Sequence, residues 1–112
     1  MIHTSYFAVA HRKASPERLV SIARKAPNGF AGAHYPQLYP PSWLLQWYKS
    51  GKVNDEEYEV LYRSEVLSKL NPETVAKQLD GKVLVCWEKS GSFCHRNLVM
   101  NWLPPNYQGG EL

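Results

Sequence analysis

The chain contains no long apolar segment and no export signal. None of its apolar runs approaches the roughly 20 residues that a membrane-spanning helix requires, so we predict no association with a membrane. The first residues, Met1–Ser5, lack a basic segment followed by an apolar stretch, and a secretory leader is therefore not expected. Disorder is excluded as well, because 44% of the residues are hydrophobic and 12% are aromatic. We expect one globular, cytoplasmic domain that spans residues 1–112.

Cysteine is scarce, since the chain has two, Cys86 and Cys94. Two thiols are too few for an all-cysteine zinc site, which needs four. No Cys-x-x-Cys or His-x-x-x-His spacing occurs either, so we predict neither a metal site nor a cofactor. Without an export signal, a reduced pair is favoured over a disulfide.

Acidic residues are almost absent from the first half of the chain, where Glu17 is the only one among residues 1–52. That half has a net charge of +6, whereas residues 53–112 have a net charge of −3. One interpretation is a dipolar globule whose two halves pack together. The alternative is that the basic half binds an anion such as a phosphate, a nucleotide or a nucleic acid.

Apolar runs and helical periodicity alternate along the chain. The predicted strands are Ile2–Val9, Leu19–Ala23 and Val83–Trp87. The predicted helices follow Ser42, Asn54 and Asn71 as caps, and the last one runs over Phe93–Leu103. Residues 28–41 match no regular element, and residues 106–112 are expected to hold little structure. This alternation predicts a small α/β domain with a short, mostly parallel sheet flanked by helices.

Polar side chains follow two of the predicted strands. Arg24 comes directly after the second strand, and Glu88 and Lys89 come directly after the third. In parallel sheets, ligands bind beyond the carboxyl ends of the strands. We therefore expect these residues to share one site.

The densest polar segment runs from Cys86 to Arg96. If Ser92 caps the last helix, Cys94 and His95 occupy the helix start, where unpaired N–H groups favour anions and lower thiol pKa values. Cys94 is then a candidate nucleophile and His95 a candidate general acid or base. The alternatives are that Cys94 is a small packing residue and that His95 lies on the helix surface. Cys86 falls inside the strand and is expected in the core.

Two charged residues of this segment have competing interpretations. Glu88 is a candidate general base or nucleophile, or else it forms an ion pair with Arg24, Lys89 or Arg96. Arg96 in a first turn opposes its own helix dipole. Such a placement indicates an anionic ligand or a fixed internal salt bridge, for which Glu88 is the candidate partner.

Aromatic residues gather in the basic half, beside Arg24 and Lys25. They are Phe30, Tyr35, Tyr39, Trp43, Trp47 and Tyr48. Aromatic rings interleaved with basic residues can stack on nucleobases and bind phosphates. The alternative is that they fill the core of a small domain.

Several segments together resemble the family called domain of unknown function 488. The strongest likeness is a Cys-x-Glu-Lys string followed by Cys-His-Arg, in Val83–Lys89 and Phe93–Val99. Further matches are Thr4–Phe7, Val20–Arg24, Phe30–Pro40, Glu56–Tyr58 and Leu67–Leu70. Around the loop where one branch of the family often has a basic residue and Ala, this chain has Ala33 and Tyr39.

The resemblance implies an intracellular α/β domain of the kind found in bacteria, archaea and phages, and it implies no established activity. The family's recurrent polar residues correspond here to Arg24, Cys86, Glu88, Lys89, Cys94, His95 and Arg96.

Three functions stay open at this point. The first is an enzyme acting on a nucleotide, a nucleic acid or a phosphorylated small molecule. Its ligand would be held by Arg24, Tyr35, Lys89 and Arg96, and its catalytic residues would be Glu88, Cys94 and His95. The second is a non-catalytic module that binds nucleic acid or protein through the basic half. The third is a protein whose two thiols respond to oxidation.

Overall fold

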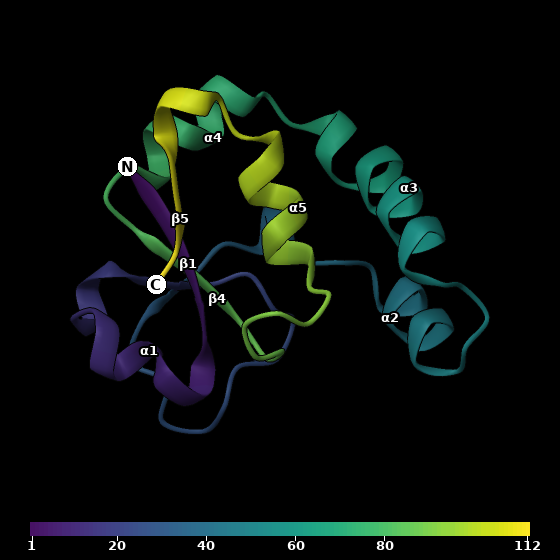
Figure 1. Ribbon diagram of the computed structural model, residues 1–112, viewed down its shortest axis with the longest axis horizontal. Helices are drawn as coiled ribbons and strands as arrows, with labels where there is room; N and C mark the ends of the chain where they lie inside the picture. Colours follow the sequence, from purple (N-terminus) through teal and green to yellow (C-terminus); the bar gives the residue numbers. More distant parts are fainter.

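A five-stranded, all-parallel sheet forms the centre of the molecule (Figure 1). It is seen in a computed structural model that describes residues 1–112. The order of the strands is β3-β2-β4-β1-β5. Their bounds are β1 Ile2–Tyr6, β2 Leu19–Ser21, β3 Ala33–His34, β4 Val83–Cys86 and β5 Gln108–Glu111. The predicted α/β class with a parallel sheet is confirmed.

Helices cover both faces of this sheet. The main core lies on one face, where Leu84 and Ile22 pack with residues of four helices. Those helices are α2 Ser42–Lys49, α3 Asp55–Glu65, α4 Pro72–Leu79 and α5 His95–Trp102. On the other face Val83 and Val85 pack against Ala10 of α1, Phe7–Lys13. Alternate residues of β4 therefore pack into the cores on opposite faces of the sheet, which explains why the strand is apolar at every position. None of the helices has the length and apolar character needed to cross a bilayer.

Two helix starts follow from local sequence signals. Asn54 accepts a hydrogen bond from the Glu57 backbone N–H at 2.8 Å, and its own N–H donates to the Glu57 carboxylate at 3.0 Å. This is a complete capping box. At the start of α4, Asn71 accepts from the Thr74 N–H at 3.1 Å, and Pro72 holds the first helical position. Both predicted starts are confirmed. The predicted Ser42 cap is wrong, because Pro41 is the N-cap of α2 and Ser42 is its first residue.

The first strand is shorter than its apolar pattern predicts. It ends at Tyr6, and the chain continues directly into α1. Ala8 and Ala10 are strong helix formers, and three basic residues lie in the last turn, where they complement the helix dipole. Alternating apolar residues over so short a stretch fit either element, so tertiary packing decided between them.

The tail is ordered, contrary to expectation. Residues 108–111 form β5, which pairs with β1 at the edge of the sheet, and the Leu112 N–H donates to the Thr4 carbonyl at 2.9 Å. Its sequence, Gln-Gly-Gly-Glu, has low β propensity, so no pattern marks it as a strand. In the segment 28–41, which is otherwise irregular, the structure adds the two-residue β3 and a 3₁₀ turn over Pro36–Leu38.

Candidate functional site

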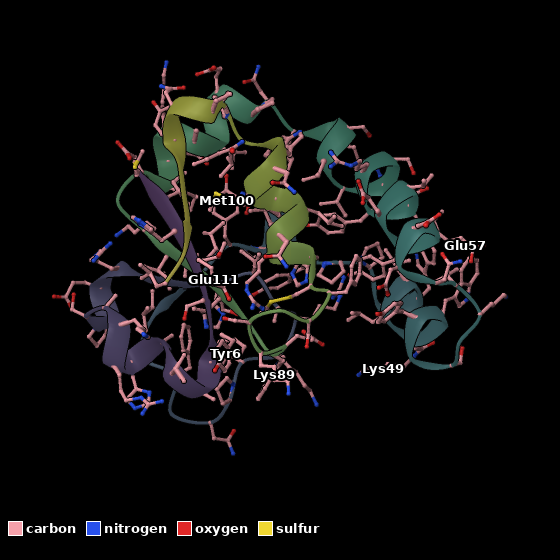
Figure 2. All side chains as sticks on the ribbon, viewed as in Figure 1. Tyr6, Lys49, Glu57, Lys89, Met100 and Glu111 are labelled. Carbon is pink, nitrogen blue, oxygen red and sulfur yellow. A yellow bond between two sulfur atoms is a disulfide. The ribbon has the colours of Figure 1, made fainter.

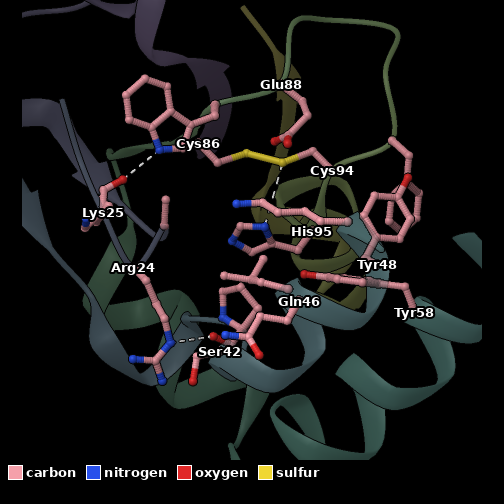
Figure 3. Close-up of a pocket in the computed structure, with 16 residues that line it drawn as sticks. Arg24, Lys25, Ser42, Gln46, Tyr48, Tyr58, Cys86, Glu88, Cys94 and His95 are labelled. Atoms are coloured by element: carbon pink, nitrogen blue, oxygen red, sulfur yellow. Dashed lines mark hydrogen bonds between the residues drawn. A yellow bond between two sulfur atoms is a disulfide. The ribbon is translucent and has the colours of Figure 1, made fainter. Parts of the chain in front are cut away.

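A pocket of about 580 Å³ opens at the carboxyl ends of β2 and β4 (Figure 3). Four of the candidate residues line it, namely Arg24, Glu88, Cys94 and His95. Arg24 follows β2, Glu88 follows β4, and the other two stand at the start of α5. These four residues therefore lie around one cavity at the strand ends.

Three cationic side chains line this pocket. Arg24 and Lys25 come from the end of β2, and Lys49 comes from the last turn of α2. None of the three forms an ion pair. The Nε of Arg24 donates to the Pro40 carbonyl at 2.9 Å, which fixes the guanidinium while leaving its two terminal nitrogens without a protein partner. The pocket thus combines positive charge with unused hydrogen-bond donors.

The opposite side of the pocket carries tyrosines and one carboxylate. Glu88 is its only acidic lining residue. Tyr58 is 3% exposed, and its hydroxyl has no hydrogen-bond partner in the protein. Figure 3 shows this hydroxyl directed into the cavity. Burial raises the pKa of Tyr58 well above its usual value, and the nearby charge of Glu88 raises it further. An unpartnered hydroxyl in a buried residue is available to a ligand.

Tyr48 is held in place at the rim. Its hydroxyl donates to the Asp55 carboxylate at 2.5 Å, and this hydrogen bond is the main reason why its pKa rises to about 12. Its ring lies 5.3 Å from that of Tyr58. The aromatic wall is therefore fixed both by packing and by a charge-assisted hydrogen bond.

His95 is buried at the floor of the pocket, so of the two alternatives for this residue a helix-surface position is excluded. Its Nε2 lies 2.7 Å from the Ile22 carbonyl, which can only accept, so Nε2 carries the proton. Its Nδ1 therefore has a free lone pair, and it faces the Cys94 sulfur at 3.8 Å. Burial lowers the pKa of His95 to about 4; the Arg96 charge lowers it further and the Ile22 hydrogen bond opposes this. His95 is neutral at physiological pH.

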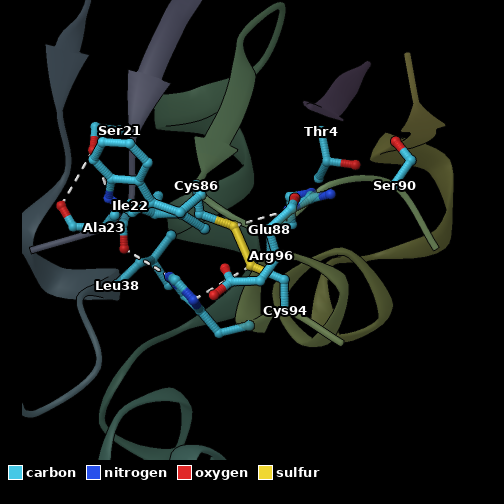
Figure 4. The surroundings of a disulfide bond; sticks show 12 residues. Thr4, Ser21, Ile22, Ala23, Leu38, Cys86, Glu88, Ser90, Cys94 and Arg96 are labelled. Carbon is cyan, nitrogen blue, oxygen red and sulfur yellow. Dashed lines mark hydrogen bonds between the residues drawn. A yellow bond between two sulfur atoms is a disulfide. The ribbon is translucent and has the colours of Figure 1, made fainter. Parts of the chain in front are cut away.

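The two cysteines are joined by a disulfide at the same floor (Figure 4). This corrects the expectation of a reduced pair, which rested on the sequence context and not on distance. The last helix also begins two residues later than predicted. Cys94 is its N-cap and His95 its first residue, and Ser92 caps nothing. In the oxidised state Cys94 is not a free nucleophile, because its sulfur is bonded to Cys86.

Arg96 lies beneath the pocket and not in it. It is 1% exposed, and its Nε and Nη2 donate to the two carboxylate oxygens of Glu111 at 3.0 and 2.7 Å. Its Nη1 donates to the Glu88 carbonyl at 2.6 Å and to the Cys86 sulfur at 3.0 Å. The internal salt bridge is therefore formed with Glu111 rather than with the Glu88 side chain. Arg96 therefore forms hydrogen bonds with β5, with the loop after β4 and with the disulfide.

The carboxylate of Glu111 makes the stability of the fold dependent on pH. Burial acts to raise its pKa, but hydrogen bonds from Arg96, Ser90 and Thr4 more than offset this and lower the pKa from 4.5 to about 2. A carboxylate with a depressed folded-state pKa stabilises the fold above its unfolded-state pKa and loses that contribution as it becomes protonated. We expect the stability that Glu111 contributes to be full above pH 4.5 and to fall between pH 4.5 and 2.

Urea unfolding as a function of pH measures this loss. His95, whose folded-state pKa is depressed, adds a separate loss as the pH falls from 6.5 to 4. The difference between the native protein and a Glu111→Gln variant isolates the Glu111 contribution. A difference that stays constant from pH 5 to pH 2.5 would contradict the prediction.

Two further candidate ligand-binding residues, besides Arg96, lie outside the pocket. Lys89 is exposed on the loop after β4 (Figure 2) and is not among the lining residues. Tyr35 packs against the main core, and its hydroxyl donates to Gln78. The pocket instead takes in one face of α2, formed by Ser42, Gln46 and Lys49. The candidates predicted from the sequence do not include these three residues. Their spacing of four and three residues places them on one face of the helix, and this spacing is the sequence signal that could have identified them.

One cluster could hold a metal ion. Cys86, Cys94 and His95 are all buried, and one potential ligand atom of each lies within 4.8 Å of the others. The spacing of these residues in the sequence matches no standard metal-binding motif, which is why the sequence predicts no metal site, and the fold brings their ligand atoms together.

Comparisons with protein-family models, with curated proteins and with solved structures gave no match. The resemblance to the domain of unknown function 488 family therefore stays a prediction.

Proposed function

We propose that this protein is an enzyme whose pocket binds a phosphate-bearing small molecule with a planar ring, of the nucleotide class. One observation carries the proposal: Arg24, Lys25 and Lys49 line a single pocket, and none of them has an ion-pair partner. Uncompensated cations gathered in a concave site attract an anion. A phosphate would accept from the free guanidinium nitrogens of Arg24 in a bidentate arrangement.

The aromatic residues of the pocket supply a place for the ring. Trp87 is 52% exposed at the rim, and its Nε1 donates to the Lys25 carbonyl at 2.7 Å. Its indole also packs edge-on against Phe7, with ring centroids 4.9 Å apart. A large apolar ring that is both exposed and immobilised offers a stacking surface at little cost in conformational entropy.

Glu88 is the best candidate for proton transfer in this pocket. It is exposed to the cavity and makes no ion pair, so its carboxylate is free to accept a proton from a ligand. Glu88 and Tyr58 line the same pocket, and the negative charge of Glu88 contributes to the raised pKa of Tyr58. His95 is less suited to proton transfer, because its Nε2–H donates to the Ile22 carbonyl and the lone pair of its Nδ1 faces the Cys94 sulfur.

The shape of the site favours a small molecule over a polymer. A pocket of about 580 Å³ falls within the range of small-molecule sites, roughly 300–1,000 Å³. A nucleic-acid surface would instead present its cations along an open groove.

The test is calorimetric titration with adenosine monophosphate, ribose phosphate and adenosine as probes. We expect the monophosphate to bind more tightly than either fragment, and Arg24→Ala or Lys49→Ala to weaken its binding about tenfold each, as expected for loss of a charge-assisted hydrogen bond. Lys77→Ala is the matched control, since Lys77 is exposed on α4 and does not line the pocket. Glu88→Gln should leave binding within a few-fold.

Two outcomes would contradict the proposal. One is equal weakening by Lys77→Ala, which would indicate only nonspecific attraction to a basic surface. The other is that none of the probes binds while a single-stranded oligonucleotide does, with an affinity that falls steeply with salt, because that would assign the basic half to nucleic acid.

A further inference from the structure

We infer that Cys86, Cys94 and His95, once the disulfide is reduced, form a binding site for a zinc-class divalent cation with one open coordination position facing the pocket. The inference goes beyond the proposed ligand and does not depend on it. It starts from the cluster of three buried ligand atoms that lie within 4.8 Å of one another. Two thiolates and one imidazole are the protein donors found in Cys₂His catalytic zinc sites.

The orientation of His95 supports this assignment. Its Nε2–H donates to the Ile22 carbonyl at 2.7 Å, which leaves Nδ1 as the lone-pair nitrogen on the side of Cys94. Histidines that bind metals characteristically donate their other ring N–H to a carbonyl or carboxylate, which fixes the tautomer and the direction of the ligand atom. The carbonyl of Ile22, the residue directly after β2, already holds His95 in the tautomer and orientation that metal binding requires.

The spacing of the backbone also suits an ion between the sulfurs. Zn–S bonds of about 2.3 Å and Zn–N bonds of about 2.0–2.1 Å in a tetrahedral site place two sulfurs about 3.8 Å apart and a sulfur and a nitrogen about 3.6 Å apart. The Cys94 sulfur and the His95 Nδ1 are separated by 3.8 Å. The Cα atoms of the two cysteines are 7.6 Å apart, wider than the usual disulfide range of about 4.4–6.8 Å. Side-chain rotation at the cysteines can therefore separate the sulfurs.

The charges around the cluster balance. Two thiolates neutralise one divalent cation. Arg96 Nη1 donates to the Cys86 sulfur at 3.0 Å, and a guanidinium donor favours the thiolate over the thiol. The positive charge of Arg96 is in turn matched by Glu111, whose carboxylate lies 2.7 Å from Nη2. The cation that directly contacts the cluster, Arg96, is therefore itself compensated by a carboxylate.

The fourth position would face the pocket, because all three ligands line it. A zinc ion with three protein ligands keeps a position for water or for a substrate oxygen and polarises what binds there. Glu88 lines the same cavity and could accept a hydrogen bond from such a water. Figure 3 shows the disulfide and His95 between Glu88 above and Gln46 below.

Reduction of the disulfide and binding of the cation balance in electrons and protons. A dithiol reductant transfers two electrons and two protons to the Cys86–Cys94 bond, which becomes two thiols while the reductant forms its own disulfide. The two thiol protons then leave to solvent as the cation binds both thiolates. Cation binding is therefore restricted to the reduced protein.

The experiment uses the full chain with zinc as the probe. Protein reduced with a phosphine reductant and freed of metal by a chelator is titrated with Zn²⁺, and bound metal is counted by mass spectrometry. We expect one ion per chain in the reduced protein and none in the oxidised one. Cys94→Ser and His95→Gln should each weaken binding by about 100-fold or more. His34→Gln is the control, since His34 is exposed and outside the cluster.

Cobalt gives a readout that does not depend on the folding of a variant. Co²⁺ bound to the reduced native chain should show intense visible bands and a sulfur-to-metal charge-transfer band, both of which report tetrahedral thiolate coordination. Failure of the reduced chain to bind Zn²⁺, or octahedral cobalt spectra, would overturn the inference and leave a simple dithiol pair. Titration of the metal-free, oxidised protein with adenosine monophosphate tests the pocket separately, so the two proposals can fail independently.

Discussion

Replacing Glu111 by Gln should lower the free energy of unfolding by about 3 kcal/mol. The change removes the partner of a guanidinium that is 1% exposed. The neutral amide keeps the size of the side chain but no longer balances the charge of Arg96, which lies 2.7 Å away. A buried ion that loses its partner costs about 3–5 kcal/mol, and we take the lower end because Arg96 keeps its bonds to Glu88 and Cys86.

Urea denaturation measures the effect, and a second ion pair provides the control. Glu59 and Arg63 form an exposed pair one helical turn apart, with N···O 2.9 Å. Glu59→Gln should cost about 0.5 kcal/mol or less. If the two variants lose similar stability, the burial of Arg96 has no energetic consequence and the interpretation is wrong.

A double variant separates lost pairing from lost packing. Arg96→Met removes the buried charge together with its need for a partner. If the unpaired charge of Arg96 causes most of the loss, Glu111→Gln should lower the free energy of unfolding much less in the Arg96→Met background than in the native protein. The coupling should then exceed about 1.5 kcal/mol. Simple additivity would show that Glu111 acts through its bonds to Thr4 and Ser90 instead.

Replacing Gly109 by Ala should cost about 2 kcal/mol and loosen the last strand. An added Cβ would lie 2.7 Å from the Ile2 carbonyl oxygen and 2.7 Å from His3 Nε2. The imidazole can rotate away, but the carbonyl belongs to β1 and can yield only if β1 and β5 separate. The strand carries Glu111, so its displacement would also weaken the contact with Arg96.

Two measurements check this prediction. The free energy of unfolding should fall, and the Leu112 amide, which donates to Thr4, should exchange with solvent faster than in the native protein. Asn106→Ala is the control, because Asn106 is exposed next to the strand and should change stability by less than about 0.5 kcal/mol. Unchanged Leu112 exchange in Gly109→Ala would show that the edge strand tolerates the clash.

Some features of this protein are determined by residues close together in the sequence. The capping box at Asn54 and the start of α4 at Asn71 depend on hydrogen bonds that span three residues. The central strand, Val83–Cys86, follows from a continuous apolar run, and its alternation with helical periodicity predicts the α/β class. The rule that ligands bind at strand ends then places Arg24 and Glu88 in one region.

Other features depend on contacts that no local pattern encodes. The tail becomes a strand because β1 offers it a free edge, and Arg96 pairs with Glu111, 15 residues away, only once that strand is docked. The cysteine pair and the neutral His95 likewise depend on how the start of α5 meets the ends of β2 and β4. Propensity and capping act through the backbone of near neighbours, whereas burial and the pairing of charges depend on which distant segments the sheet brings together.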